Sequence, residues 1–322
     1  MPDIANITLT PHFDHDILRL RPPKNAVDPF VPYAFVVEPE RAASERVEDV
    51  ATIFLTNREC PFRCLMCDLW KNTLDERVPV GAIPRQIDFA LERLTAARHV
   101  KLYNSGNFFD RQAIPPEDFP AIAARVSRFE TVIVENHPLL CDEVCLRFRD
   151  LLPASTELEI AIGLETVHPD VLPRLNKRMT LDDFARAVKF LREAGIHVRA
   201  FILLRPPFLS EAEGIEWALR SIDFAFDCGV RCCSVIPTRG GNGIMEQLVA
   251  AGDFSPPTIR SLETVLDAAL RQPRGRVFVD LWDAERFFDC AFCGPARRER
   301  LRQMNHTQAV LPPVRCSCSV ES

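Results

Sequence analysis

Short apolar or β-branched runs alternate with longer stretches of helical periodicity from residue 51 to residue 282. The helical stretches lie near residues 84–97, 116–128, 141–151, 181–194, 211–228 and 256–271. Several of them begin with capping residues or an acidic first turn, as in TLDDF and SEAEG. The apolar runs predict seven strands: TIFLT (52–56), HVKLYNS (99–105), TVIVEN (131–136), LEIAIGL (158–164), HVRAFILL (197–204), CCSVIP (232–237) and RVFVDLW (276–282).

This alternation predicts an α/β fold built on a parallel sheet. Six consecutive strand–helix units and a last strand imply parallel strands joined by right-handed crossovers. The number of units favours a partial (β/α)6 barrel over a flat sheet, and chemistry in such barrels lies at the carboxyl ends of the strands. The predicted parts are an irregular, proline-rich N-terminal extension (1–48), a core barrel (49–283) and a small cysteine-rich appendage (284–322).

The charge balance limits which partners are expected. The chain has 45 acidic and 39 basic residues, so its net charge of −6 argues against a broad nucleic-acid-binding surface. The basic stretch RRERLR (297–302) is predicted to be a solvated helix face. No apolar run approaches the roughly 20 residues of a membrane span, and the stretch MPDIANITLTPHFDHD lacks the features of a signal peptide. We therefore expect a cytoplasmic protein with no membrane partner.

Cytoplasmic thiols are kept reduced, so clustered members of the twelve cysteines predict metal or redox chemistry. Cys60, Cys64 and Cys67 form such a cluster on the loop after the first predicted strand. A structural zinc site needs four protein ligands, and a redox Cys-x2-Cys needs only two thiols. Three thiolates holding a [4Fe–4S] cluster, with its fourth iron open to a ligand, fit the spacing best. Zinc and inert packing remain the alternatives.

The Cys-x3-Cys-x2-Cys loop after the first strand of such a barrel resembles the radical SAM superfamily. The resemblance implies that the open iron binds S-adenosylmethionine (SAM). Cleavage of SAM then gives a 5′-deoxyadenosyl radical that abstracts hydrogen from the substrate, with the electron coming from a donor such as flavodoxin or ferredoxin. Cys60, Cys64 and Cys67 are accordingly expected to be catalytic as well as metal ligands. Phe62 is expected beside the adenine, with plain loop packing as the alternative reading.

The family also binds SAM with residues at later strand ends. In YNSGNF, Ser105, Gly106 and Asn107 are similar to the glycine-containing segment that hydrogen-bonds the SAM amino group; a simple turn is the alternative. After the third strand, Glu135, Asn136 and His137 are candidates to face the substrate. A histidine there is suited to proton exchange near neutral pH, although a lone histidine is more often a packed loop residue.

The ends of the fourth and fifth strands supply three further candidates. Glu165 ends a hydrophobic strand, where a carboxylate is costly without a partner or a role. LNKRMT resembles the elongator-like branch of the family, so Lys177 is expected to reach the SAM carboxylate or ribose, with Arg178 as second choice and a surface charge as the alternative. Arg205 precedes two prolines that fix an extended turn, and it is expected to hold an anionic group of SAM or substrate.

Four more cysteines lie in the appendage, as Cys290-x2-Cys293 and Cys316-x-Cys318. Two pairs of thiols match a structural zinc site, and they also match a second, fully ligated iron–sulfur cluster. The absence of any metal is the third reading. The remaining cysteines are predicted to be buried packing residues, at positions 141, 145, 228, 232 and 233.

Several segments together resemble the archaeosine-forming radical SAM family (RaSEA): LYNSGNFFDRQAIP, LLRPPFLSEAE, GDFSPPTIRSLETVLD and CAFCGPARRERLRQMNHTQ. The resemblance implies a lyase acting on a lysine adduct of a 7-deazaguanine base in tRNA, from which it forms the formamidine of archaeosine. The alternatives are a radical SAM enzyme that dehydrogenates or methylthiolates a small metabolite, and a non-enzymatic zinc-binding barrel protein.

Overall fold

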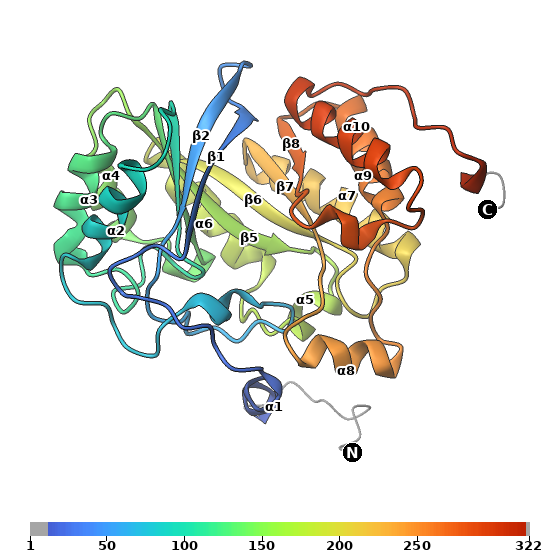
Figure 1. Cartoon of the computed structure of the whole chain (residues 1–322), viewed down its shortest axis with the longest axis horizontal. Helices are drawn as coiled ribbons and strands as arrows, with labels where there is room; N and C mark the ends of the chain where they lie inside the picture. Colours follow the sequence, from blue (N-terminus) through green and yellow to red (C-terminus); the bar gives the residue numbers. More distant parts are fainter. Residues whose placement is uncertain (1–11, 320–322) are drawn as a thin grey trace. The chain divides into compact units, whose positions relative to one another are not determined.

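The computed structural model describes residues 12–319. Across these residues the strands follow one another in a single sheet in the order β1-β2-β3-β4-β5-β6-β7-β8 (Figure 1). β1 pairs antiparallel with β2, whereas β2 to β5 and the β7–β8 pair are parallel. The strands are β1 (Ala34–Arg41), β2 (Val47–Phe54), β3 (His99–Tyr103), β4 (Thr131–Asn136), β5 (Glu157–Glu165), β6 (His197–Leu204), β7 (Cys232–Pro237) and β8 (Arg276–Val279).

Helices follow most strands, as the alternation of patterns predicts. Capping boxes start two of them, with Thr180 and Asp183 at one and Ser210 and Glu213 at the other, so their first backbone N–H groups are satisfied locally. The helices are α1 (His12–Leu20), α2 (Ala82–Leu91), α3 (Phe119–Val126), α4 (Glu143–Leu151), α5 (Val171–Arg174), α6 (Leu181–Glu193), α7 (Glu211–Cys228), α8 (Ile244–Ala251), α9 (Ile259–Arg271) and α10 (Gly294–Thr307). None of these helices is long and apolar enough to cross a membrane.

The chain divides into two compact units. The first, here called the cysteine-loop unit, comprises residues 22–163 and 177–199. The second, called the C-terminal unit, comprises residues 164–176 and 200–319 together with residues 12–21 among the described ones. The division of the sequence at residues 48 and 283 stays a prediction.

The strands differ from the prediction at several places: β2 begins earlier, at Val47, and β3 ends earlier, at Tyr103. The two largest differences concern β1, which was not predicted, and β8. β1 lies inside the stretch expected to be irregular, where AFVVEPER includes Pro39. β1 is at the edge of the sheet, so the missing N–H of proline is tolerated there. β8 ends at Val279, before its predicted end, because the Asp280 side chain accepts a hydrogen bond from the Trp282 N–H (2.9 Å) and turns the chain.

An aromatic cluster in the cysteine-loop unit fixes the segment that follows β3. The rings of Phe108, Phe109, Phe119 and Phe148 pack with centroids 5.1–6.1 Å apart, mostly edge to face. All four side chains are buried. Burying a phenylalanine contributes about 1.5–3 kcal/mol, so this cluster is a rigid support for the loop at the carboxyl end of β3.

The basic stretch at 297–302 is not the fully solvated helix face that was predicted. It lies in α10, and Arg297 and Arg300 are each only 5% exposed. Both guanidinium groups pair with Glu263 of α9, and Arg300 also pairs with Asp267 at 2.7 Å. A spacing of three residues puts both arginines on the same side of the helix. The other two arginines of the stretch are exposed, as predicted.

Candidate functional site

The three-cysteine loop follows β2 and is held in place by its own polar contacts. The Cys67 N–H donates to the Cys64 carbonyl (3.2 Å), which closes a turn around the last two thiols. The indole N–H of the buried Trp70 donates to the Cys67 carbonyl (3.2 Å). Glu59 and Arg63 form an ion pair at 3.1 Å across the start of the loop. The backbone that presents the cysteines is therefore ordered by residues of the same segment.

The three thiols lie near one another, but their sulfur atoms are too far apart for all three to bind one metal ion. Burial raises the pKa of Cys67, and negative charge on Cys64 and Cys60 raises it further, so the three sulfurs interact. Among residues 12–319, however, they are not one of the groups whose ligand atoms all lie within 4.8 Å of one another. A single ion needs such a tight group, whereas a cubane cluster places each thiolate on a different iron. The donor set therefore fits a multi-iron cluster.

The segment after β3, which was predicted to bind the SAM amino group, contacts this loop. The Asn107 side-chain amide donates to Cys60 Sγ (3.2 Å). A Cβ atom added to Gly106 would lie 3.4 Å from the Cys60 Cβ, which is an ordinary contact distance, so the two residues are neighbours. Ser105 takes another direction, since its hydroxyl bonds to the Tyr33 hydroxyl (2.7 Å). Asn107 and Gly106 are thus placed against Cys60.

Glu135 organises the same segment from the end of β4. Its carboxylate accepts hydrogen bonds from the backbone N–H groups of Asn104 and Gly106, the latter at 3.3 Å. Burial raises the pKa of Glu135 from 4.5 to about 7, and the backbone donors and the charge of Lys177 only partly oppose this. Glu135 was predicted as a candidate to face the substrate, but its observed hydrogen bonds hold the β3 loop.

Stability should therefore depend on pH through Glu135. The pKa of Glu135 is higher in the folded state than in the unfolded state. Its contribution to the free energy of unfolding is therefore fully present below pH 4.5 and is lost as the pH rises through about 7. The shift corresponds to about 3 kcal/mol. Glu135→Gln keeps an acceptor oxygen but does not titrate. Urea unfolding at pH 5 and pH 8 should show the native protein losing stability relative to this variant as the pH rises, and parallel losses would contradict the assignment.

Asn104 is a polar residue of this site that sequence reasoning missed. Its Oδ1 atom is buried and has no hydrogen-bond partner among the described residues, while its Nδ2 donates to Asn57 (2.6 Å). A buried acceptor without a donor is costly, so this atom suits a ligand N–H group such as the SAM amino group. The predicted strand (99–105) included Asn104, whereas β3 ends at Tyr103, so the place of Asn104 at the strand end is seen only in the structure.

Lys177, His137 and Phe62 form a second set of contacts near the loop. The Leu139 N–H donates to His137 Nδ1 (3.1 Å), so the ring proton lies on Nε2, which donates to the Lys177 carbonyl (3.0 Å). Burial and the Lys177 charge lower the pKa of His137 to about 3. The imidazole therefore stays neutral and does not exchange a proton near neutral pH.

Phe62 lies against His137. The two rings are stacked, with centroids 3.8 Å apart and planes 11° from parallel. One face of the phenyl ring is thus covered by the imidazole, which leaves the opposite face for an adenine. Contact between Phe62 and adenine stays a prediction.

Lys177 is favoured over Arg178 by its surroundings. Lys177 is buried, at 8% exposure, whereas Arg178 is exposed. Burial raises the pKa of Cys60, and both the Asn107 hydrogen bond and the Lys177 charge work in the opposite direction. The ammonium group is therefore close enough to favour a thiolate at Cys60 and an anionic ligand beside it.

Strand ends in both units carry unusual backbone conformations. Ser105 after β3, Glu165 at the end of β5 and Arg205 after β6 all have positive φ, of 51°, 65° and 52°. Such conformations cost about 1–3 kcal/mol each in residues other than glycine, and they concentrate at functional sites. The sequence analysis named the same three residues, Ser105 from a resemblance to a family segment and the other two from their places at strand ends.

Arg205 and Glu165 belong to the C-terminal unit. Arg205 Nη1 donates to the Pro256 carbonyl (2.9 Å), but its buried Nε has no hydrogen-bond partner among the described residues. Gly214 of α7 packs directly against it, since an added Cβ would lie 2.8 Å from the Arg205 Cα. The free donor suits an anion. Glu165 is buried, at 6% exposure.

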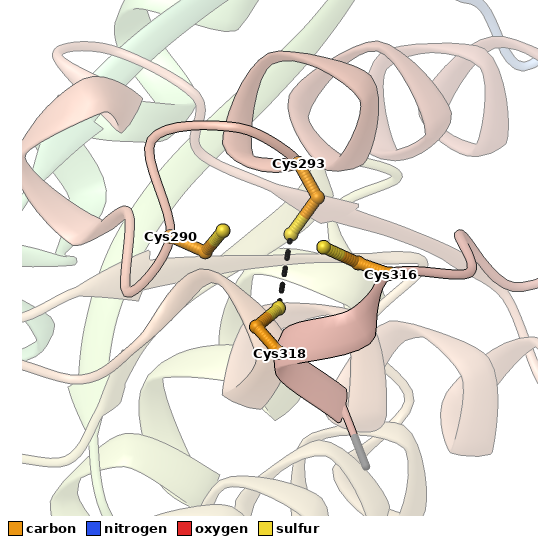
Figure 2. Close-up of side chains that lie close together, drawn as sticks. All are labelled: Cys290, Cys293, Cys316 and Cys318. Carbon is orange, nitrogen blue, oxygen red and sulfur yellow. Dashed lines mark hydrogen bonds between the residues drawn. The ribbon is translucent and has the colours of Figure 1, made fainter. Parts of the chain in front are cut away.

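The C-terminal unit also brings the four appendage cysteines together. The sulfurs of Cys290, Cys293, Cys316 and Cys318 all lie within 4.8 Å of one another, and the four side chains converge in Figure 2. Of the cysteines expected to be buried, those at positions 145, 232 and 233 are buried, and those at 141 and 228 are half-buried.

Comparisons with known proteins bear on the family and not on single site residues. The model of the radical SAM superfamily matches residues 54–216. The archaeosine synthase subunit beta of Methanosarcina acetivorans is 28% identical over 272 residues, which cover 79% of this chain and 77% of that protein. The protein of the same name from Thermococcus kodakarensis is 29% identical over 226 residues, covering 67% and 69%.

A solved structure shows the same fold. Methylornithine synthase (PylB) superposes with a TM-score of 0.53 at 16% identity, over 81% of this chain and 73% of that one. This likeness, together with the sheet described above, confirms the predicted α/β class of partial parallel barrel. At this identity it carries no information on substrate.

Proposed function

The chain belongs to the radical SAM superfamily, and from this premise we propose that it acts on a lysine adduct of a 7-deazaguanine base in tRNA. The observation that supports the radical chemistry is the three-thiol loop after β2, with an amide donor on Cys60 and a buried lysine nearby. When bound, a [4Fe–4S] cluster and SAM supply the 5′-deoxyadenosyl radical that abstracts hydrogen. The residues of the chain bind, orient and shield these groups.

Each protein group has a distinct proposed role. Cys60, Cys64 and Cys67 hold three irons and leave the fourth open to SAM. Asn107 donates to Cys60 Sγ, which stabilises negative charge on that ligand. The buried Asn104 Oδ1 is suited to accept a hydrogen bond from the SAM amino group. In the C-terminal unit, Glu165 and the partner-free Nε of Arg205 are proposed as ligand-binding groups.

Lys177 is proposed to pair with the SAM carboxylate. Replacing it with methionine keeps much of the buried side-chain volume but removes the charge. A hydrogen bond to a charged group contributes about 1.5–3 kcal/mol, so the Kd for SAM should rise roughly 10- to 150-fold. Equilibrium binding to the iron-reconstituted variant measures this, with iron content as the check that the cluster is present. Arg178→Met is the matched control because Arg178 is exposed. Equal losses in both variants would exclude this role for Lys177.

The substrate proposal is supported by two relatives named archaeosine synthase subunit beta. We propose that the radical takes a hydrogen from the lysine side chain and that a carbon–nitrogen bond of that side chain then breaks. Cleavage leaves an alkene on the lysine fragment and a nitrogen-centred radical on the base. One electron from the reductant and one proton convert that radical into the formamidine. This assigns the enzyme to the lyases.

A deuterium-transfer experiment tests the substrate. Reconstituted protein is incubated anaerobically with SAM, a reductant and tRNA carrying the adduct, with deuterium on the lysine side chain. We expect deuterium in the 5′-deoxyadenosine and a formamidine base in the tRNA, both detected by mass spectrometry. The free modified nucleoside is the second arm, because the net charge of −6 favours a small substrate if tRNA is not bound. Unlabelled 5′-deoxyadenosine in both arms would contradict the substrate assignment.

A further inference from the structure

The spacing of the four appendage sulfurs distinguishes between kinds of metal site. Cys293 Sγ and Cys318 Sγ are 3.7 Å apart, and all four sulfurs lie within 4.8 Å of one another (Figure 2). With zinc–sulfur bonds of about 2.3 Å, a tetrahedral site places its sulfurs about 3.8 Å apart. A [4Fe–4S] cluster binds each thiolate through a different iron, so its ligand sulfurs are separated by about 6 Å. The observed spacing matches a single ion.

We propose that Cys290, Cys293, Cys316 and Cys318 bind one zinc ion and that this ion fastens the C-terminal segment 308–318 to α10. Four thiolates complete the tetrahedral coordination and leave no position for water or substrate, so the site is structural. It goes beyond the proposed function, because it needs neither SAM nor the first cluster. The reading that the appendage carries a second iron–sulfur cluster is the main alternative.

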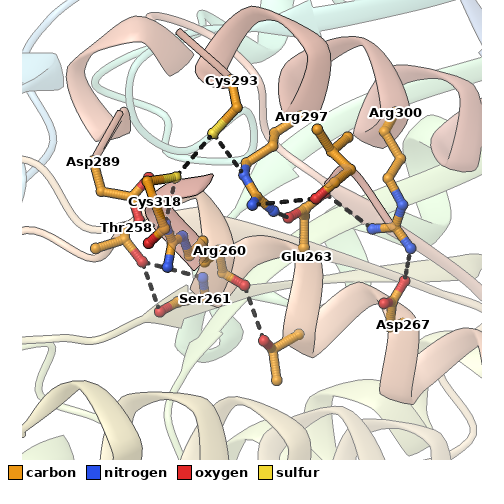
Figure 3. Close-up of polar contacts among 12 residues, drawn as sticks. Thr258, Arg260, Ser261, Glu263, Asp267, Asp289, Cys293, Arg297, Arg300 and Cys318 are labelled. Carbon is orange, nitrogen blue, oxygen red and sulfur yellow. Dashed lines mark hydrogen bonds and ion pairs between the residues drawn. The ribbon is translucent and has the colours of Figure 1, made fainter. Parts of the chain in front are cut away.

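Two arginines donate hydrogen bonds to sulfurs of this group. Arg260 Nη2 donates to Cys318 Sγ (2.9 Å), and Arg297 Nε donates to Cys293 Sγ (3.2 Å), as Figure 3 shows. Zinc with four thiolates carries two negative charges, and N–H groups that donate to the sulfurs stabilise ligands of this kind. Arg260 is in turn paired with Asp289 (2.8 Å), so its orientation is fixed. Such supporting contacts are typical of metal sites.

The peptide around the site lacks the burial that would otherwise hold it. Phe292, between the first two cysteines, is 90% exposed. The segment after α10 has no regular structure up to Arg315, and its side chains are half-buried or exposed. Arg300 donates to the carbonyls of Leu311 and Pro312, at 2.6 Å and 2.9 Å. Arg297 donates to the Val314 carbonyl (3.4 Å), and the Gln308 side chain bonds to the backbone of Val277. The segment is thus held by single polar contacts and not by buried apolar side chains. A bound metal ion holds the segment in place where apolar contacts are few, because the free energy of metal binding adds to the free energy of unfolding.

Metal analysis of the full-length chain tests the proposal. After anaerobic reconstitution with iron in the presence of zinc, we expect about one zinc and about four irons per chain. Cys318→Ser should lose the zinc and keep the iron, whereas Cys64→Ala should lose the iron and keep the zinc. Cys228→Ser is the control for removing a cysteine outside both groups. A chain with about eight irons and no zinc would overturn the proposal, as would a chain without metal at the appendage.

A measurement on the unmodified protein covers the case in which a variant does not fold. A colorimetric zinc indicator should detect release of one equivalent when a strong chelator is added. Limited proteolysis should then cut within 308–315, where the native protein is protected. If chelation removes zinc without exposing this segment, the proposed fastening is wrong even though zinc is bound. Neither readout depends on SAM cleavage, so failure here is separate from failure of the proposed function.

Discussion

Cys64→Ala is expected to abolish iron binding at the first loop and to lower SAM cleavage at least about a thousand-fold. Two thiolates cannot hold three irons, so the variant should lack the cluster rather than contain an altered one. A thousand-fold loss corresponds to about 4 kcal/mol in the barrier, which is larger than the effect of any single hydrogen bond in the site. Iron content, visible absorption and 5′-deoxyadenosine formation after reconstitution measure the three consequences together.

The matched control is Cys228→Ala, which removes a half-buried thiol at the end of α7. It should keep its iron and its SAM cleavage, with at most a modest loss of stability. If Cys64→Ala cleaved SAM at the native rate, or if both variants lost iron equally, the loop would not be the cluster site.

Glu263→Gln is expected to destabilise the chain by about 3–5 kcal/mol, because it leaves the buried Arg297 guanidinium without its carboxylate partner, whereas Arg300 keeps Asp267. Glu263 is 6% exposed and accepts from two buried guanidinium groups, those of Arg297 and Arg300 (Figure 3). Glutamine has nearly the same shape, so the loss reports charge and not packing. Urea unfolding of the apo protein measures the difference in free energy.

Glu299→Gln is the control for this change. Glu299 lies on α10, but its ion pair with Arg302 is about half exposed on both sides. Exposed pairs contribute about 0–1 kcal/mol, so this variant should unfold almost as the native protein does. A loss at Glu263 no greater than at Glu299 would show that the buried network contributes little to stability.

The sequence identified strands by local signals that the structure repeats. TVIVEN and HVRAFILL coincide with β4 and β6 because β-branched and apolar residues fill strands buried in a parallel sheet. β1 was missed because Pro39 interrupts AFVVEPER, and only its place at the edge of the sheet makes that proline tolerable. That place depends on pairing with β2, which no local pattern records.

The sequence identified individual residues of the candidate site, but it did not predict the contacts between them. The cysteine spacing and the strand-end positions of Ser105, Glu165 and Arg205 are local features. The bond from Asn107 to Cys60 joins residues 47 positions apart, and the bonds of Glu135 to the β3 loop span about 30. Burial of Arg297 likewise depends on a carboxylate 34 residues earlier. Such pairings follow from the topology, so they could be found only once the strands and helices were placed.

Reductive SAM cleavage by the reconstituted chain is the most direct test of the central claim. Protein reconstituted anaerobically with iron and sulfide is incubated with SAM and dithionite, and the products are separated by liquid chromatography with mass detection. The account predicts methionine and 5′-deoxyadenosine in protein that contains about four irons at the first loop. A protein that holds this iron, binds SAM and still forms no 5′-deoxyadenosine, with or without candidate substrates, would contradict it.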